Sequence, residues 1–146
     1  MQRICTYGVF YAPDLRDTLH IFNAHFDHIG SEAREKSAQL LVDKVMDYGL
    51  REKMVVLMGD FNASPSSPPI QYLKSELVDG REVAHTYFSG PEGTFSGFKE
   101  AAALEDRIDY IFTNYLAVRT YRHITDLRPN GRWPSDHLPV MVEVMD

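Results

Sequence analysis

Side chains that can bind a metal ion or move a proton follow an apolar run of strand length near the middle of the sequence. Asp60 and Asn62 lie in the segment Gly59-Asp60-Phe61-Asn62, directly after the run 54–58. The Asp60 carboxylate can hold a metal ion or accept a proton from water, and the Asn62 amide can hold that water or a phosphate oxygen. Asp and Asn also form ordinary turns, so this motif taken alone favours a structural role.

A second group lies near the C-terminus, where Ser135-Asp136-His137 precedes an alternating segment. Asp136 and His137 could share a metal ion and a phosphate group, and a solvated loop pair is the simpler alternative. Asp109 makes a functional role for His137 more favoured than a solvated loop pair, because a carboxylate on a strand is costly to bury without a partner. A histidine N–H is a suitable partner, since an Asp often fixes the tautomer of a functional His. We therefore predict that Asp109 contacts His137.

His25 is the third candidate, at the end of a strand-like segment. It could contact a phosphoryl oxygen or a leaving group, although a single histidine at a strand end is usually structural. Asp27 and His28 follow, and for His28 the capping of the next turn is the favoured role. A functional role for His25 is therefore supported only in combination with the other candidate residues.

Hydrophobic patterning predicts the elements that position these residues. Strands are expected at Arg3–Phe10 and Thr18–His25, joined as a hairpin around Pro13-Asp14. The unbroken apolar run 54–58 is typical of a central strand covered on both faces. Further short strands are expected at 94–95, 107–112, 116–123 and 138–144, and the alternation in 107–112 places Asp109 opposite the Tyr110 face.

Two helices complete the predicted layered α/β sandwich. The first begins with Ser31 as N-cap and ends at Gly49, and its i, i+3, i+4, i+7 stripe of Ala38, Leu41, Val42 and Val45 should be buried. The second is short, with Ser67 as N-cap and Pro68 at its first position.

Composition limits the classes of function. With 44% apolar and 25% charged residues, the 146-residue chain is an ordinary globular sequence. No apolar run approaches the roughly 20 residues that cross a bilayer, so no membrane span is expected. The net charge of −6 disfavours nucleic-acid binding by broad phosphate neutralisation, but a metal ion could supply positive charge for a small phosphate ester. Cys5 is the only cysteine, which excludes an internal disulfide and leaves localisation open.

Read in order, five segments resemble the endonuclease/exonuclease/phosphatase superfamily, the fold of deoxyribonuclease I-like enzymes. Each motif is weak singly, and their shared order carries the resemblance. They are NAHFDHIG (23–30), GDFNASP (59–65), GTFSGF (93–98), RIDYIF (107–112) and SDHLPV (135–140).

The resemblance implies hydrolysis of a phosphate ester by activated water, with Mg²⁺ or alternatively Mn²⁺ as cofactor. Catalytic roles would fall to His25, Asp60, Asn62, Asp109 and His137. In these roles Asp60 activates the water, Asn62 orients it, His25 and His137 bind phosphoryl oxygens, and Asp109 holds His137. The metal ligands would be Asp60, Asn62, Asp136 and His137.

The resemblance also implies half of a four-layered α/β sandwich, with a mostly antiparallel sheet and flanking helices. No segment before Asn23 matches the Asn and the metal-binding Glu that family members carry early in the domain. We therefore expect residues 1–146 to form one domain that lacks its N-terminal half. The sheet face that this half covers should be apolar and open, and should bind the missing half or a second copy.

The sequence leaves three functions open. The first is metal-dependent hydrolysis of a small phosphate ester, by a phosphodiesterase or a phosphatase. The second is a catalytically inactive fragment or binding module, because the principal metal-binding Glu has no counterpart. The third, a nuclease acting on DNA or RNA, is disfavoured by the charge. Phe95, Phe98 and Trp133 could line a pocket for a sugar, a lipid headgroup or a base.

Overall fold

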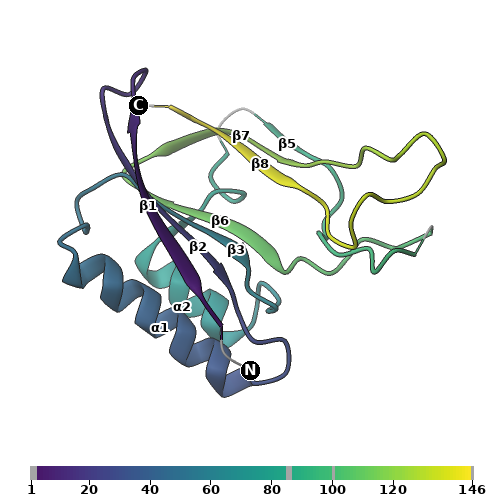
Figure 1. The fold of residues 1–146 in the computed structure, drawn as a ribbon, viewed down its shortest axis with the longest axis horizontal. Helices are drawn as coiled ribbons and strands as arrows, with labels where there is room; N and C mark the ends of the chain where they lie inside the picture. The colour runs from purple at the N-terminus through teal and green to yellow at the C-terminus, as the bar shows by residue number, and fades with distance from the viewer. Residues whose placement is uncertain (1–2, 85–86, 100, 146) are drawn as a thin grey trace.

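A computed structural model describes residues 3–84, 87–99 and 101–145. These residues form two helices and two sheets in three layers, with both helices on one face of the larger sheet and the smaller sheet over its other face (Figure 1). The elements in chain order are β1 (Cys5–Ala12), β2 (Asp17–His25), α1 (Ser31–Asp47), β3 (Val55–Asp60), α2 (Pro68–Glu76), β4 (Val78–Asp79), β5 (Tyr87–Ser89), β6 (Asp109–Asn114), β7 (Ala117–His123) and β8 (Val140–Met145).

The larger sheet has the strand order β1-β2-β3-β6-β4, and the smaller has the order β5-β7-β8. Four of the strand pairs are antiparallel, and the pairs β2–β3 and β5–β7 are parallel. The expected hairpin, the central strand and the two helices are all present. None of the helices in the described part of the chain is both long and apolar enough to cross a membrane.

Some local details differ from the predictions. Ser31 is the first residue of α1, and Gly30 occupies the N-cap without a side-chain hydrogen bond. The turn before α1, for which Asp27 and His28 were both possible caps, is capped by Asp27, because its Oδ1 accepts the N–H groups of Ile29 and Gly30 at 2.7 and 2.8 Å. Segment 94–95 forms an isolated bridge instead of a strand, with Phe95 opposite His137. The strands β4 and β5 were not predicted, because their two and three residues are too few to show an alternation of apolar and polar side chains.

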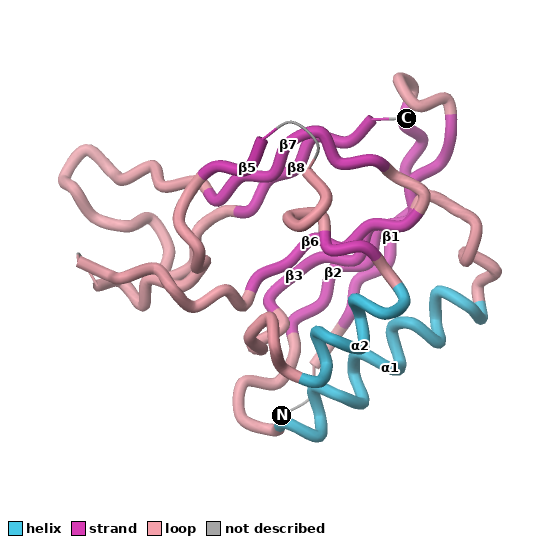
Figure 2. The backbone as a smooth tube through the Cα atoms, turned by 180° about the vertical axis from the view of Figure 1, so that it is seen from behind, coloured by secondary structure: helices cyan, strands magenta, loops and turns pink. Residues whose placement is uncertain are grey.

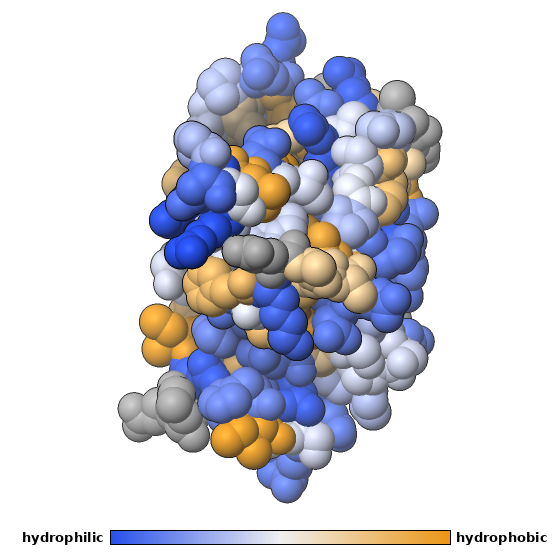
Figure 3. Space-filling view, turned by 90° about the vertical axis from the view of Figure 1, so that its right-hand side faces the viewer, coloured by the Kyte–Doolittle hydropathy of each residue, from blue (hydrophilic) through white to orange (hydrophobic). Residues whose placement is uncertain are grey.

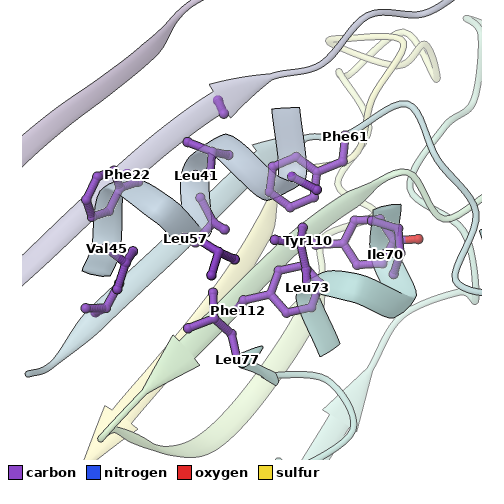
Figure 4. Close-up of a cluster of buried hydrophobic side chains, with 14 of the residues drawn as sticks. Phe22, Leu41, Val45, Leu57, Phe61, Ile70, Leu73, Leu77, Tyr110 and Phe112 are labelled. Carbon is purple, nitrogen blue, oxygen red and sulfur yellow. The ribbon is translucent and has the colours of Figure 1, made fainter. Parts of the chain in front are cut away.

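The main core lies between the two helices and the larger sheet (Figure 4). All four residues of the predicted stripe on α1 are buried there. From the sheet, alternate residues point toward the helices, so Val55 and Leu57 on β3 are fully buried. Aromatic rings extend this core toward the end of β3, where Phe61 stacks on Tyr110 and Phe112.

A second, smaller core lies on the opposite face of the larger sheet, and it corrects one expectation. This face was predicted to be open, but β5, β7 and β8 of the same chain cover part of it (Figure 2). Val56 and Ile111 are buried against Tyr121 of β7, and the β8 residues 140, 142 and 144 pack at its margin. The prediction is wrong for the covered part of the face, because 116–123 and 138–144 belong to a separate sheet that packs over it.

Gly59 allows β2 and β3 to approach each other beside the site residues. Its backbone lies at φ 138°, and a Cβ atom there would come within 1.9 Å of the Ala24 carbonyl oxygen. Any side chain would therefore push the end of β3 away from β2. Glycine is required immediately before Asp60 for this reason.

We expect Gly59→Ala to destabilise the fold by at least about 1–3 kcal/mol, because it adds a steric clash to an unfavourable φ. Urea unfolding measures this change in free energy. Gly131→Ala is the matched control, since Gly131 also has a positive φ but nothing lies within 4 Å of the position that a Cβ atom would take there. An equal loss of unfolding free energy in both variants would show that the clash of the new Cβ atom with Ala24 does not destabilise the fold.

Candidate active site

Strand register places three of the predicted residues side by side. His25 of β2 pairs with Asp60 of β3, and Asp60 pairs in turn with Asp109 of β6. Residues directly opposite one another on neighbouring strands point to the same face. On β3 this is the face away from the helices, because Val55 and Leu57 point toward them. The three side chains therefore converge at one edge of the larger sheet.

A groove of about 190 Å³ runs over this part of the sheet. Asp60 and Asp109 lie in its wall, together with Met58, Leu138 and Val140. Both carboxylates are partly buried. Charged groups at the edge of an apolar groove are poorly solvated, so they act more strongly on a bound group than they would in water.

The Asp60 carboxylate is the centre of the site. Its Oδ1 accepts the backbone N–H of Asn62 at 2.9 Å, and its Oδ2 accepts the Asn62 side-chain amide at 3.2 Å. Nε2 of His25 lies 3.3 Å from the same Oδ2, and Nε2 of His137 lies 3.8 Å from it. Asn62 has a positive φ of 47°, which turns the chain back so that its side chain reaches Asp60. Two imidazoles and one amide thus face a single carboxylate.

The predicted contact between Asp109 and His137 is present. Nδ1–H of His137 donates to Oδ2 of Asp109 at 2.8 Å. Burial alone would lower the pKa of His137, but this hydrogen bond and the negative charges of Asp109, Asp60 and Asp136 outweigh burial and raise its pKa. Burial raises the pKa of Asp109, against the hydrogen bonds from Thr94 and His137. Asp109 therefore fixes the ring of His137 with Nε2 directed toward Asp60.

Thr94 is a supporting residue that the sequence analysis missed. Its hydroxyl is completely buried, donates to Oδ2 of Asp109 at 2.6 Å and accepts the backbone N–H groups of Ile108 and Asp109 at 3.1 Å. The same short segment holds the loop that carries His137, because the N–H of Leu138 donates to the Thr94 carbonyl at 2.7 Å. The motif GTFSGF was the only signal for this role.

Asp136 does not join the group around Asp60. The closest set of possible metal-binding atoms comes from Asp60, Asp109 and His137, all within 4.8 Å of one another. Phe95 and His137 form a β-bridge, so the chain is extended here and neighbouring side chains point to opposite sides. The carboxylate of Asp136 accepts instead a long hydrogen bond of 3.4 Å from Ser135. A metal-binding role for Asp136 stays a prediction.

This set of donors fits a magnesium ion held by few protein ligands. Mg²⁺ is commonly bound by one or two carboxylates, with water and substrate phosphate oxygens completing its coordination. Asp60 and Asp109 both lie in the groove wall, and each accepts two hydrogen bonds: those of Asp109 are both at Oδ2, whereas Oδ1 and Oδ2 of Asp60 accept one each. Asp60 is thus the residue best placed to hold such an ion, and binding should be weak without a further carboxylate.

Arg3 is a second residue that the sequence analysis missed. Its guanidinium donates to Nδ1 of His28 at 2.8 Å and lies 3.2 Å from Nε2 of His25. A fixed positive charge thus stands beside His25. No local pattern predicted it, because Arg3 lies far from the site in sequence and reaches it only through the β1–β2 pairing.

The imidazole of His137 should lose its raised pKa when Asp109 is replaced by Asn. The amide keeps a similar shape but removes the negative charge that stabilises the protonated ring. NMR titration of the His137 ring in the metal-free chain measures this change. An unchanged pKa of His137 in Asp109→Asn would contradict the proposed pairing.

Comparison with known proteins gives one sequence family and a consistent set of structures. The sequence model of the Endonuclease/Exonuclease/phosphatase family matches residues 2–137. Among curated proteins, none matches the sequence. The described fold is that of deoxyribonuclease I-like proteins, as predicted from the five motifs.

Three solved structures with similar folds are each longer than this chain. A mannosyl-6-phosphatase from Bacteroides thetaiotaomicron is 34% identical, with a TM-score of 0.89 over 99% of this chain and 57% of its own. An endonuclease/exonuclease/phosphatase family protein from the same organism is also 34% identical, with a TM-score of 0.87 over 97% of this chain and 55% of its own. The catalytic domain of human Nocturnin, with a bound sulfate, shares the fold at 18% identity and a TM-score of 0.77, over 99% of this chain and 53% of its own. The chain thus spans little more than half the length of these proteins.

Proposed function

The chain belongs to the endonuclease/exonuclease/phosphatase family, and we propose that the polypeptide containing it hydrolyses a small phosphate ester with a divalent metal ion, Mg²⁺ or Mn²⁺. The observation that carries this proposal is the alignment of His25, Asp60 and Asp109 across three neighbouring strands, with His137 held against it. This arrangement combines a carboxylate base in the wall of the groove with two imidazoles that lie beside that carboxylate. It contains no serine, cysteine or threonine positioned as a nucleophile among the described residues.

Asp60 would accept the proton of the attacking water. The Asn62 amide, which now donates to Asp60, would orient that water or hold a phosphoryl oxygen. Because Asn62 also donates to the Phe26 carbonyl at 3.2 Å, its side chain is held in place before substrate binds. A metal ion at Asp60 would supply positive charge to the phosphoryl oxygens and lower the pKa of bound water.

His137 would bind a phosphoryl oxygen through Nε2. Since its Nδ1–H is donated to Asp109, Nε2 carries a proton only in the imidazolium form. The raised pKa of His137 favours that form. His25, with Arg3 beside it, would stabilise negative charge on the other side of the phosphoryl group.

The pH dependence of the rate follows from this assignment. As the pH rises through the raised pKa of His137, the imidazolium and its Nε2–H are lost, and kcat should fall. In Asp109→Asn the pKa of His137 is lower, so the fall should move to lower pH. Profiles of kcat against pH for both proteins test this, and an identical alkaline limb would remove His137 from the mechanism.

The preferred substrate class is a small ester, and nucleic acid is possible but not favoured. The structural relative that is a mannosyl-6-phosphatase supports a sugar phosphate. The net charge of −6 disfavours a long polyanion. Rates of phosphate release from mannose 6-phosphate, and of cleavage of bis(p-nitrophenyl) phosphate and single-stranded DNA, rank the three classes. Faster cleavage of DNA than of either small ester would contradict this assignment.

A catalytically inactive binding module is the second candidate. It is favoured by the small number of carboxylates at the groove and by the length of the chain relative to its structural neighbours. Calorimetric titration of the 146-residue chain with Mg²⁺ separates the two. Saturable binding that is lost in Asp60→Asn supports a metal site in this chain and counts against the inactive module.

A further inference from the structure

Two loops of the chain extend beyond both sheets on the side of the molecule where the candidate active site lies (Figure 1). Their described residues are 90–99 and 101–108 after β5 and 124–139 after β7, and the two loops meet around a pocket of about 450 Å³. Its lining consists of Phe98, Arg128, Arg132, Trp133 and Pro134. This volume lies within the usual range for small-molecule sites, roughly 300–1,000 Å³. Figure 3 views the molecule from this side and shows apolar groups set among polar ones.

The pocket is joined directly to the loop that carries His137. The Trp133 indole N–H donates to the Lys99 carbonyl at 3.0 Å, which ties the two loops together. The N–H groups of Ser96 and Gly97 donate to the Asp136 carbonyl at 2.7 and 3.2 Å. Both loops that line the pocket are therefore fastened to the segment that carries His137.

Phe98 has a conformation that folding alone does not favour. Its backbone φ is 59°, in the left-handed region, and 62% of the residue is exposed. A bulky residue in this region is strained, and exposure of the ring contributes no burial energy. Strained residues of this kind collect at sites that bind ligands. The sequence therefore keeps an aromatic ring here at a cost to stability.

The charges of the pocket select for an anion. The Arg132 guanidinium is exposed and makes no ion pair with any residue that the structure describes, and Arg128 donates only a long hydrogen bond of 3.4 Å to the Pro134 carbonyl. Within the described part of the chain, neither therefore has a carboxylate partner, although the chain as a whole is acidic. A guanidinium is well suited to bind phosphate or carboxylate oxygens through two hydrogen bonds.

We propose that Phe98, Trp133, Arg128 and Arg132 form the leaving-group pocket of the enzyme, which binds the ring of a small phosphate ester that carries a second anionic group. The inference rests on the proposed function for the position of the reacting phosphate. The aromatic rings contact the ring of the substrate, and the arginines bind its second phosphate or carboxylate. The reacting phosphate lies at Asp60 and His137.

Trp133 is the only tryptophan of the chain, so its fluorescence reports on this pocket alone. Titrations use glucose 1,6-bisphosphate against glucose 6-phosphate, and adenosine 3′,5′-bisphosphate against adenosine 5′-monophosphate. They are performed on Asp60→Asn, so that no ligand is consumed, with calorimetry as a second readout. We expect a saturable fluorescence change and at least about 10-fold tighter binding of a bisphosphate than of its monophosphate, since a charge-assisted hydrogen bond contributes about this much. Tighter binding in the glucose series would identify the substrate ring as a sugar, and tighter binding in the adenosine series would identify it as a nucleoside.

The preference for the second anionic group should disappear in the double variant Arg128→Ala/Arg132→Ala and should remain in Arg119→Ala, which removes an exposed arginine from β7. Phe98→Gly should weaken binding without loss of stability, because glycine accepts the positive φ. Equal binding of mono- and bisphosphates, or a preference that survives in the double variant, would overturn the proposal. Because binding is measured without turnover, a protein that selects bisphosphates but hydrolyses none would refute the proposed function and leave the pocket intact.

Discussion

Replacing Asp60 with Asn should lower kcat for phosphate-ester hydrolysis by about 10²–10⁴-fold, the usual contribution of a positioned general base. The change keeps the shape of the side chain and one hydrogen-bond acceptor. It removes the charge that would accept the proton from water and hold the metal ion. KM should change much less, because the imidazoles of His25 and His137 still bind the phosphoryl group. Steady-state kinetics of the polypeptide containing this chain measures both parameters.

The position of Asp60 makes this loss specific. Its carboxylate receives hydrogen bonds from Asn62 and faces both imidazoles, so no neighbouring carboxylate among the described residues can replace it. Asp109 is the nearest alternative, but its Oδ2 is occupied by Thr94 and His137. Asp43→Asn, an exposed substitution on α1, is the control and should leave the rate unchanged. A kcat for Asp60→Asn within a few-fold of the wild type would show that water is activated elsewhere.

Arg107→Met should destabilise the fold by about 3–5 kcal/mol, because it leaves a buried carboxylate without its partner. Two hydrogen bonds of 2.9 and 2.6 Å join the Arg107 guanidinium to Asp79, and both residues are only 3% exposed. The guanidinium also lies over the Tyr110 ring, 4.4 Å from its centroid. Methionine fills part of the space, so the loss comes mainly from the uncompensated charge. Urea unfolding measures it.

Two further variants identify the cause. Lys36→Met breaks the exposed pair with Glu32 on α1, and such surface pairs contribute at most about 1 kcal/mol. The double variant Arg107→Met/Asp79→Leu removes both buried charges and should recover much of the lost stability. If Arg107→Met lowers the free energy of unfolding no more than Lys36→Met does, the buried ion pair does not hold β4 against β6.

This pair also explains how the site depends on the fold. Arg107 stands two residues before Asp109, at the point where the chain enters β6. Its contact with Asp79 fixes that entry, and the register of β6 on β3 then sets Asp109 beside Asp60. A variant that loosens the ion pair should therefore reduce activity as well as stability.

The sequence predicted the local elements well, since each depends on patterns within one segment. The hairpin, the central strand, the buried stripe of α1 and Pro68 at the start of α2 all follow from such patterns. The placement of 116–123 and 138–144 in a separate sheet could not be predicted, because alternation shows that a strand has two faces but not which sheet it joins. For the same reason the cover that β5, β7 and β8 give to part of the apolar face was not expected.

The sequence indicated the candidate site residues, but their geometry could not be predicted. His25, Asp60 and Asp109 were each identified from their own motif, yet only the register of β2, β3 and β6 aligns them. Thr94 and Arg3 were missed because their partners lie far away in sequence. The pocket around Trp133 depends in the same way on two loops whose meeting no local pattern encodes.

The most direct test of the central claim is the rate of phosphate release from a small phosphate ester as Mg²⁺ is titrated into the metal-free polypeptide that contains this chain. We predict no release in the presence of a chelator and a rate that rises to saturation with Mg²⁺. In Asp60→Asn the rate at saturating Mg²⁺ should be lower by about 10²-fold or more. Release that is equally fast with the chelator, or a metal response that Asp60→Asn leaves unchanged, would contradict the claim that Asp60 and a divalent metal ion act together in hydrolysis.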